Sequence, residues 1–197
     1  MIANTHRLIG EFLYNQLSPT NQNHIHKEWF IYGNIKPDIS QKYLRMSHYY
    51  RDNREIIFSM LNHLLTHPVS VKHFSEHLGV IIHFFCDYAC VYHANDYLYE
   101  HHSLAKHIKY EVKLHRYAKI KFQKMDPVKA IPFKDVQEIQ YYVSELTRGM
   151  NEVPLIRSVS QDFEDMVVLA LSVMQYVITH FEFNKLLVTD YPKRSKI

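Results

Sequence analysis

Five residues with metal-ligating side chains lie close together in the middle of this sequence. They follow one another in the order His83-x3-Asp87-x5-His93-x13-His107-x3-Glu111, within a segment that is otherwise apolar enough to form a protein core. A buried, ionised aspartate is costly unless it is paired or coordinates a metal ion. The segment therefore predicts a metal site. Its mixture of imidazole and carboxylate donors suits zinc, with other divalent ions as alternatives.

Helical periodicity divides these residues into two groups. At helical spacing His83 and Asp87 share one face of a helix, and His107 and Glu111 share one face of the next helix. We expect the two pairs to face each other across a helix–helix seam, where bundles place cofactor sites. A regular helix would put His93 about 120° away from Asp87. His93 is therefore expected to act with the second pair on a second ion.

Chance is the competing explanation for such pairs, because the chain has 15 histidines. The pairs His63/His67 and His73/His77 have the same spacing and are expected to face solvent. The apolar neighbours of His83 and Asp87 weaken this explanation for the central set. The sequence has no HExxH motif, no Glu-x-x-His and no His-Asp dipeptide. These absences argue against zincin metalloproteases, ferritin-like di-iron bundles and HD-type phosphohydrolases.

Helices are expected to position these residues. Four Gly and seven Pro are few for 197 residues, which favours an all-α protein over a sandwich or barrel. Pro37 is expected to place Asp38 in a turn or loop from which the carboxylate can reach inward. The predicted bundle has about six helices, which span residues 4–17, 48–67, 70–92, 103–122, 133–149 and 159–187. The third helix is expected to bend near Gly79. A turn at Pro154 is expected to separate the last two helices.

Length and charge limit the classes of function. A chain of 197 residues with a formal charge of +3 fits a single domain over 1–197, and it has no long basic run. We therefore expect no stable nucleic-acid partner. Cys86 and Cys90 are expected to be buried thiols. The N-terminal residues do not have the pattern of a secretory signal. The apolar run 166–183 is expected to be a core helix rather than a transmembrane segment. The sequence therefore predicts a cytoplasmic protein.

The central motif, together with the upstream His6, Asp38 and His48, resembles the zinc-dependent phospholipase C family, the bacterial enzymes of the phosphatidylcholine-hydrolysing type. The likeness extends from His6 to about Tyr117. It implies the all-α, single-domain, multi-helix bundle that this family shares with the fungal single-strand-specific nucleases.

The resemblance also implies a set of zinc ligands. One Zn²⁺ ion would be held by four residues and a second by three: Asp38, His48, His83 and Asp87 for the first, and His93, His107 and Glu111 for the second. A third ion in the family is bound by Asp87, a histidine that corresponds to His6, and the amino and carbonyl groups of the mature N-terminal residue. Whether this third site forms here is left open, because Met1 lies only five residues before His6.

The function implied is phosphodiester hydrolysis of a phospholipid or other phosphodiester substrate by metal-activated water. Asp38 is the candidate general base, with a role as ligand only as the alternative. Tyr43, Tyr49 and Tyr50 are candidates for a head-group pocket, because aromatic faces attract quaternary ammonium groups. The alternatives are a nuclease or nucleotidase that uses the same metals, and a non-catalytic helical protein with a structural metal site. The sequence leaves the oligomeric state open.

Overall fold

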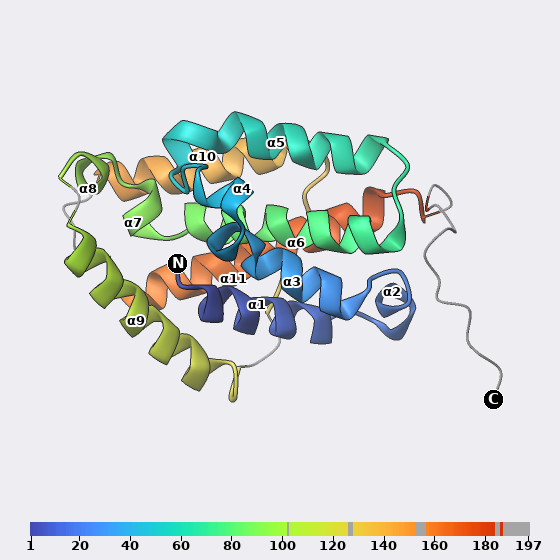
Figure 1. Cartoon of the computed structure of the whole chain (residues 1–197), viewed down its shortest axis with the longest axis horizontal. Coiled ribbons are helices and arrows are strands. Elements are labelled where there is room, and N and C mark those ends of the chain that lie inside the picture. Colours follow the sequence, from blue (N-terminus) through green and yellow to red (C-terminus); the bar gives the residue numbers. More distant parts are fainter. Residues whose placement is uncertain (102, 126–127, 153–156, 184–185, 187–197) are drawn as a thin grey trace.

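The computed structural model describes residues 1–101, 103–125, 128–152, 157–183 and 186, and these residues form helices and connecting loops without any strand. The predicted all-α fold is thus confirmed. Seven of the eleven helices in this part of the chain have 13 or more residues. The helices are α1 (Ala3–Asn15), α2 (Pro19–Gln22), α3 (Lys27–Ile39), α4 (Gln41–Leu44), α5 (Tyr50–Thr66), α6 (Val71–Tyr88), α7 (Val91–Ala94), α8 (Asp96–Glu100), α9 (Leu104–Lys121), α10 (Val136–Glu152) and α11 (Val159–His180) (Figure 1).

Helix α6 is the centre of the bundle. It packs against α3, α5 and α11, and these helices surround it in Figure 1. The side chain of Ser70 caps its first turn by accepting a hydrogen bond from the backbone N–H of His73. Every residue from Leu78 to Tyr88 is buried, including His83 and Asp87. A helix that is apolar on nearly all sides belongs in the interior, and this is where α6 lies.

Two glycines let α3 and α6 cross with their backbones in contact. A Cβ atom on Gly79 would lie 2.8 Å from the backbone nitrogen of Asn34 and 2.8 Å from the Cα atom of Gly33. A Cβ atom on Gly33 would overlap the backbone carbonyl oxygen of Glu76 on α6. Real Cβ atoms essentially never approach other atoms this closely. The crossing therefore requires glycine at both positions, and it brings the end of α3 next to His83.

The prediction that Asp38 lies in a loop is wrong. Pro37 lies inside α3, and Asp38 belongs to the last helical turn. Proline removes one backbone donor and crowds the carbonyl of the residue four positions earlier, which is Gly33. This cost falls close to the end of α3, and the close packing of that helix on α6 outweighs it. The segment 20–47, for which no helix was predicted, contains α2, α3 and α4.

The central helix is also shorter than predicted. It ends at Tyr88 rather than near Tyr92, because Ala89 caps it and Cys90 has extended backbone angles of φ −105° and ψ 126°. The one-turn helix α7 then begins at Val91. The prediction for α9 is correct to within one residue at each end.

Other element boundaries differ by a few residues from the predicted ones. Helix α5 begins at Tyr50, so His48 lies in the loop before it. Helix α11 ends at His180, before the predicted end at 187. The turn predicted at Pro154 lies outside the described residues. Within the described ranges, no helix is both long enough and apolar enough to cross a membrane.

Candidate metal centre

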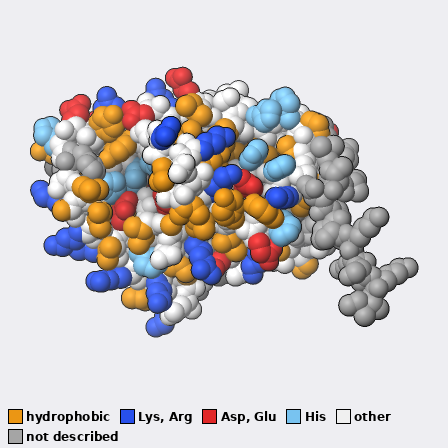
Figure 2. All heavy atoms as spheres, in the orientation of Figure 1, with side chains coloured by type: hydrophobic (Ala, Val, Ile, Leu, Met, Phe, Trp, Pro, Cys, Tyr) orange, Lys and Arg blue, Asp and Glu red, His pale blue; other side chains and the backbone are white. Residues whose placement is uncertain are grey.

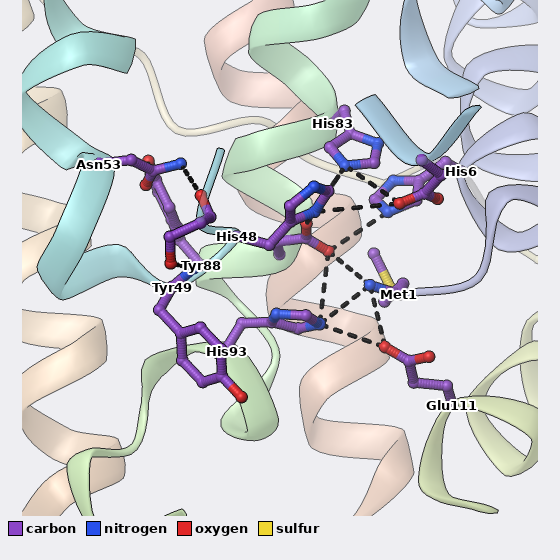
Figure 3. A network of polar contacts seen from close by, with 12 residues as sticks. Met1, His6, His48, Tyr49, Asn53, His83, Tyr88, His93 and Glu111 are labelled. Carbon is purple, nitrogen blue, oxygen red and sulfur yellow. Dashed lines mark hydrogen bonds and ion pairs between the residues drawn. The ribbon is translucent and has the colours of Figure 1, made fainter. Parts of the chain in front are cut away.

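All eight predicted ligand residues meet at one end of α6. Figure 3 labels His6, His48, His83, His93 and Glu111 among them. They come from five helices and one loop, so the bundle as a whole fixes their positions. Their donor atoms form three groups in which all donors lie within 4.8 Å of one another: Asp38, His48 and His83; His93, His107 and Glu111; and His6, His83 and Asp87.

Asp87 is the residue that connects these groups. Its carboxylate is fully buried, with Oδ2 at 2.9 Å from Nδ1 of His48 and 3.2 Å from Nε2 of His83. Oδ1 lies 3.3 Å from Nε2 of His6 and 2.8 Å from the amino group of Met1. Burial alone would raise the pKa of Asp87, but the positive amine and the surrounding imidazoles hold it well below its usual range. Asp87 is therefore an anionic carboxylate at the centre of the site.

The first group joins the end of α3 to α6 and the loop before α5. Nε2 of His83 lies 3.3 Å from Nδ1 of His48 and 3.8 Å from Oδ1 of Asp38. Nδ1 of His83 lies 2.8 Å from the carbonyl oxygen of Asn34. A carbonyl can only accept, so Nδ1 carries the proton and Nε2 presents a lone pair to the group. Such an outer partner is the usual way in which proteins orient a metal-binding histidine.

The second group lies between α7 and α9. Oε1 of Glu111 is 2.9 Å from Nε2 of His107 and 3.2 Å from Nε2 of His93. The two imidazole Nε2 atoms are 3.3 Å apart. His93 was predicted to join this group because a regular helix would turn it away from Asp87. The structure gives a different reason, because the helix stops at Tyr88 and His93 belongs to α7.

The third group contains His6 of α1 and lies beside the chain's first residue. The ring of His6 stacks on the ring of His83 with 3.6 Å between centroids. The amino group of Met1 is 2.9 Å from Nε2 of His93 and 3.1 Å from Oε1 of Glu111. Helix α9 packs mainly on α1 and α11. The two helical pairs therefore meet through Met1 and His93, rather than across a direct seam of α6 and α9 as predicted.

The geometry of these donors fits metal ions. Zn–N and Zn–O distances of about 2.0–2.2 Å put tetrahedral ligands about 3.3–3.6 Å apart. The separation of the donor atoms in each imidazole pair, His83/His48 and His93/His107, is 3.3 Å. Several buried polar atoms have no hydrogen-bond partner, including both ring nitrogens of His6 and Oδ2 of Asp38. Buried polar atoms are normally satisfied, so these atoms indicate that the site is built for cations.

A second set of residues holds the loop that carries His48. Asn53 of α5 donates from Nδ2 to the carbonyl oxygen of Ser47, at 2.5 Å. Its Oδ1 accepts from the hydroxyl of Tyr88 at 2.6 Å (Figure 3). Both Asn53 and Tyr88 are buried. Their bonds tie the loop to the last residue of α6, one position after Asp87. Neither Asn53 nor Tyr88 was predicted from the sequence to support the site.

The three tyrosines predicted for a head-group pocket are not brought together. The ring of Tyr49 lies 5.7 Å from the ring of His93 and 4.6 Å from the ring of Tyr99, beside the cluster. Tyr43 is buried and lines a surface cavity of about 400 Å³ between α4, α5 and α6. Tyr50 packs against Tyr88 and lines a different cavity, between α5 and α10. Of the three, only Tyr49 lies against a residue of the three groups.

Comparison with known proteins gives one family. The sequence profile of the zinc-dependent phospholipase C family matches residues 5–153 of the 197 in this chain. The matched range contains all eight residues of the three groups and the whole of α2 to α9, and it begins within α1. No curated protein and no solved structure matches the chain. The match covers well over half of the sequence, so this chain belongs to the zinc-dependent phospholipase C family.

Proposed function

We propose that this protein is a zinc-dependent phosphodiester hydrolase that acts on phospholipids. The observation that carries the proposal is the convergence of three donor groups around Asp87, in a chain of this family. The proposed ligands are His6, Asp38, His48, His83, Asp87, His93, His107 and Glu111. Two zinc ions would be held by the groups that contain His48 and His93. The group that contains His6 is the candidate for a third.

Bound zinc would supply Lewis-acid stabilisation of a phosphate and a water molecule whose pKa is near neutrality. The protein residues fix where this chemistry takes place. The imidazole nitrogens and the carboxylates of each group lie within 4.8 Å of one another, and α1, α6 and α9 supply the buried members of the groups. The side chains of Asp38 and His48 are 16% and 18% exposed, whereas those of His83 and Asp87 are fully buried. Substrate therefore enters on the side of Asp38 and His48.

Asp38 is the proposed general base. Oδ1 of Asp38 faces His83 and His48, at 3.8 Å and 3.9 Å. The second carboxylate oxygen, Oδ2, has no hydrogen-bond partner. One oxygen can thus face a metal ion while the other accepts a proton from an attacking water molecule. A general base needs a position within hydrogen-bond reach of the reacting water, and Oδ2 of Asp38 is buried, so that water would have to lie inside the site.

Exposed apolar side chains beside the ligands support a lipid as substrate. Ile39, which follows Asp38, is 53% exposed, and Ile108, which follows His107, is 48% exposed. Leu44 of α4 and Leu104 of α9 are exposed as well. Figure 2 shows hydrophobic side chains (orange) together with Lys and Arg side chains (blue) over the left part of this face. Apolar side chains near a catalytic site suit lipid chains. A cavity beside α7 and α9 is lined by Tyr92, Lys106, Tyr110 and Arg157, which is the lining that a nucleic-acid substrate would need, so the nuclease alternative is tested alongside.

The test is hydrolysis by the zinc-loaded protein of short-chain phosphatidylcholine and, separately, of single-stranded oligonucleotides. We expect the first substrate to yield diacylglycerol and the phosphorylated head group. Asp38→Asn should retain most zinc and lose turnover, and His83→Ala should lose both. The matched control is His63→Ala, which removes an exposed histidine outside the three groups. Cleavage of oligonucleotides but not of phospholipid would refute the proposed substrate class, and a zinc-loaded protein that cleaves neither would refute hydrolysis.

A further inference from the structure

Helix α7 has only four residues, yet it carries His93. An isolated helix of this length has no stability of its own, because nucleation costs more than one turn of hydrogen bonds returns. Its position therefore depends on other elements, through the packing of Val91 and Ala94 against Met150 of α10 and through hydrogen bonds at its two ends. Asn151 of α10 holds the C-terminal end, by donating from Nδ2 to the carbonyl oxygen of Ala94 at 3.3 Å and accepting from the backbone N–H of Asp96 at 2.7 Å.

The N-terminal end of α7 is held by a carboxylate from α11. Oδ2 of Asp162 accepts a hydrogen bond of 2.8 Å from the backbone N–H of Val91, the first residue of α7. The Asp162 side chain is fully buried. Charged hydrogen bonds to the first N–H groups of a helix are among the stronger polar contacts in proteins. Asp162 thus fixes the point at which the chain restarts after the break at Cys90.

The same carboxylate also reaches the other half of the second metal-ligand group. The hydroxyl of Tyr110, on α9, donates to Oδ2 of Asp162 at 2.5 Å. The ring of Tyr110 lies 4.8 Å from the ring of Tyr92, which in turn stacks on His107 at 4.9 Å with 21° between planes. One buried carboxylate therefore touches both α7, which carries His93, and α9, which carries His107.

Arg157 neutralises this buried carboxylate. Its Nε donates to Oδ1 of Asp162, and its Nη2 donates to Asp165. A buried charge that lacks a partner would be strongly destabilising, and Arg157 supplies the partner. Residues 157 and 162 both lie beyond the range 5–153 that matches the family. The residues that fix this part of the site are thus outside the segment by which the family is recognised.

We propose that Asp162 is a positioning residue for the second metal ion, which it controls by setting the distance and angle between His93 on α7 and His107 on α9. The inference rests on the proposed function, because it assumes that these two histidines bind zinc. Outer partners of metal ligands typically contribute about 10- to 100-fold to metal affinity. Asp162 contacts Val91 and Tyr110 rather than the histidines themselves, so removal of its carboxylate should reduce affinity at the second ion by about 10-fold, the lower end of this range, and leave the group of Asp38, His48 and His83 unchanged.

The experiment is a competitive zinc titration of the full chain with a chromogenic chelator, which needs no substrate. His83→Ala and His93→Ala serve as references. Each variant should abolish the binding of the zinc ions that depend on one ligand group, and this identifies that class of bound zinc in the titration. Asp162→Ala should weaken the class that His93→Ala removes. Asp162→Asn keeps an oxygen acceptor for Val91 and should cause a smaller loss. Equal weakening of both classes, or unchanged affinity in Asp162→Ala, would overturn the inference.

The matched control is Ser172→Ala. Ser172 is also on α11 and fully buried, and it accepts a hydrogen bond of 2.8 Å from the backbone N–H of Ile131 in another segment. It lies about three turns further along the helix than Asp162. Its replacement should lower thermal stability without changing either zinc class. If it weakens the second class as much as Asp162→Ala does, the effect is general destabilisation and the inference fails.

A second variant covers the case in which Asp162→Ala does not fold, as judged by circular dichroism. Tyr110→Phe removes only the hydroxyl that donates to Asp162 and keeps the ring that packs on Tyr92. It should weaken the same zinc class to a smaller extent, and unchanged affinity would overturn the inference. A wild-type chain that binds no zinc would instead refute the proposed function.

Discussion

The crossing of α3 and α6 at Gly33 and Gly79 gives the sharpest prediction for the fold and the site together. In Gly79→Ala the new methyl group would lie 2.8 Å from two backbone atoms, whereas ordinary contacts begin near 3.4 Å. The helices must therefore separate by more than about half an ångström. Overpacking of this kind costs about 3 kcal/mol when the neighbours are backbone. The better helix propensity of Ala returns about 1 kcal/mol, so a net loss of about 2 kcal/mol is expected.

The same separation should reach the metal centre. His83 follows Gly79 by one turn, and its Nδ1 bonds to the carbonyl oxygen of Asn34, which follows Gly33. Lengthening this 2.8 Å bond removes the contact that orients His83. We therefore expect Gly79→Ala to weaken zinc binding at the first group as well as to destabilise the fold.

The assay for this prediction is urea unfolding of zinc-loaded and zinc-free protein, with Gly149→Ala as the control. Gly149 is also helical, and a Cβ atom there would meet nothing within 4 Å. This control should gain up to about 1 kcal/mol of stability because Ala replaces Gly in a helix. If Gly79→Ala were as stable as Gly149→Ala, the account of a glycine-dependent crossing would be refuted.

Three further predictions concern the site. Asn53→Ala leaves the buried hydroxyl of Tyr88 without its acceptor, so we expect the free energy of unfolding in urea to fall by about 1–3 kcal/mol. Zinc binding at the group of His48 should also weaken. An unchanged free energy of unfolding and unchanged zinc affinity would contradict the role of Asn53. Zinc at 100 times its dissociation constant should raise the free energy of unfolding by about 2.7 kcal/mol. Thermal unfolding with and without a chelator measures this change. An unchanged melting temperature would count against zinc binding. The third prediction concerns the pH dependence of stability. Burial lowers the pKa of the Met1 amine, but the carboxylates of Asp87, Glu111 and Asp38 have a larger, opposite effect. Together they raise the pKa of the amine from 8.0 to about 12. The amine therefore stabilises the zinc-free fold below its unfolded pKa, and this contribution should disappear as the pH rises from 8 toward 12. A chain extended by Gly-Ser before Met1 has no charged amine at this position and should lack this component of the pH dependence; identical pH profiles would contradict the assignment.

The metal-capable groups were predictable because their residues recur at helical spacing in apolar surroundings. His83 with Asp87 and His107 with Glu111 each lie on one helical face, so two of the three groups could be outlined from local periodicity. The grouping of His93 was predicted from a helix that does not extend that far. Its actual position depends on a break at Cys90, for which the sequence carries no glycine or proline signal.

The helical state of Asp38 could not be predicted from local preference. Pro37 argues against helix at this point, and only the packing of Gly33 on Gly79 shows why α3 continues through it. That contact joins residues far apart in the sequence, so no local pattern reports it. The supporting residues Asn53 and Asp162 were missed for a similar reason, because their partners are backbone groups of other elements.

The central claim is that the clustered histidines and carboxylates hold zinc ions that activate water. Metal analysis of the purified chain after equilibration with zinc and removal of the excess tests this claim most directly. We predict at least two zinc ions per chain, with one class lost in His83→Ala and another in His93→Ala, and no loss in the exposed control His63→Ala. A folded wild-type chain that retains no zinc, or that retains as much zinc in His83→Ala and His93→Ala as in the wild type, would contradict the account.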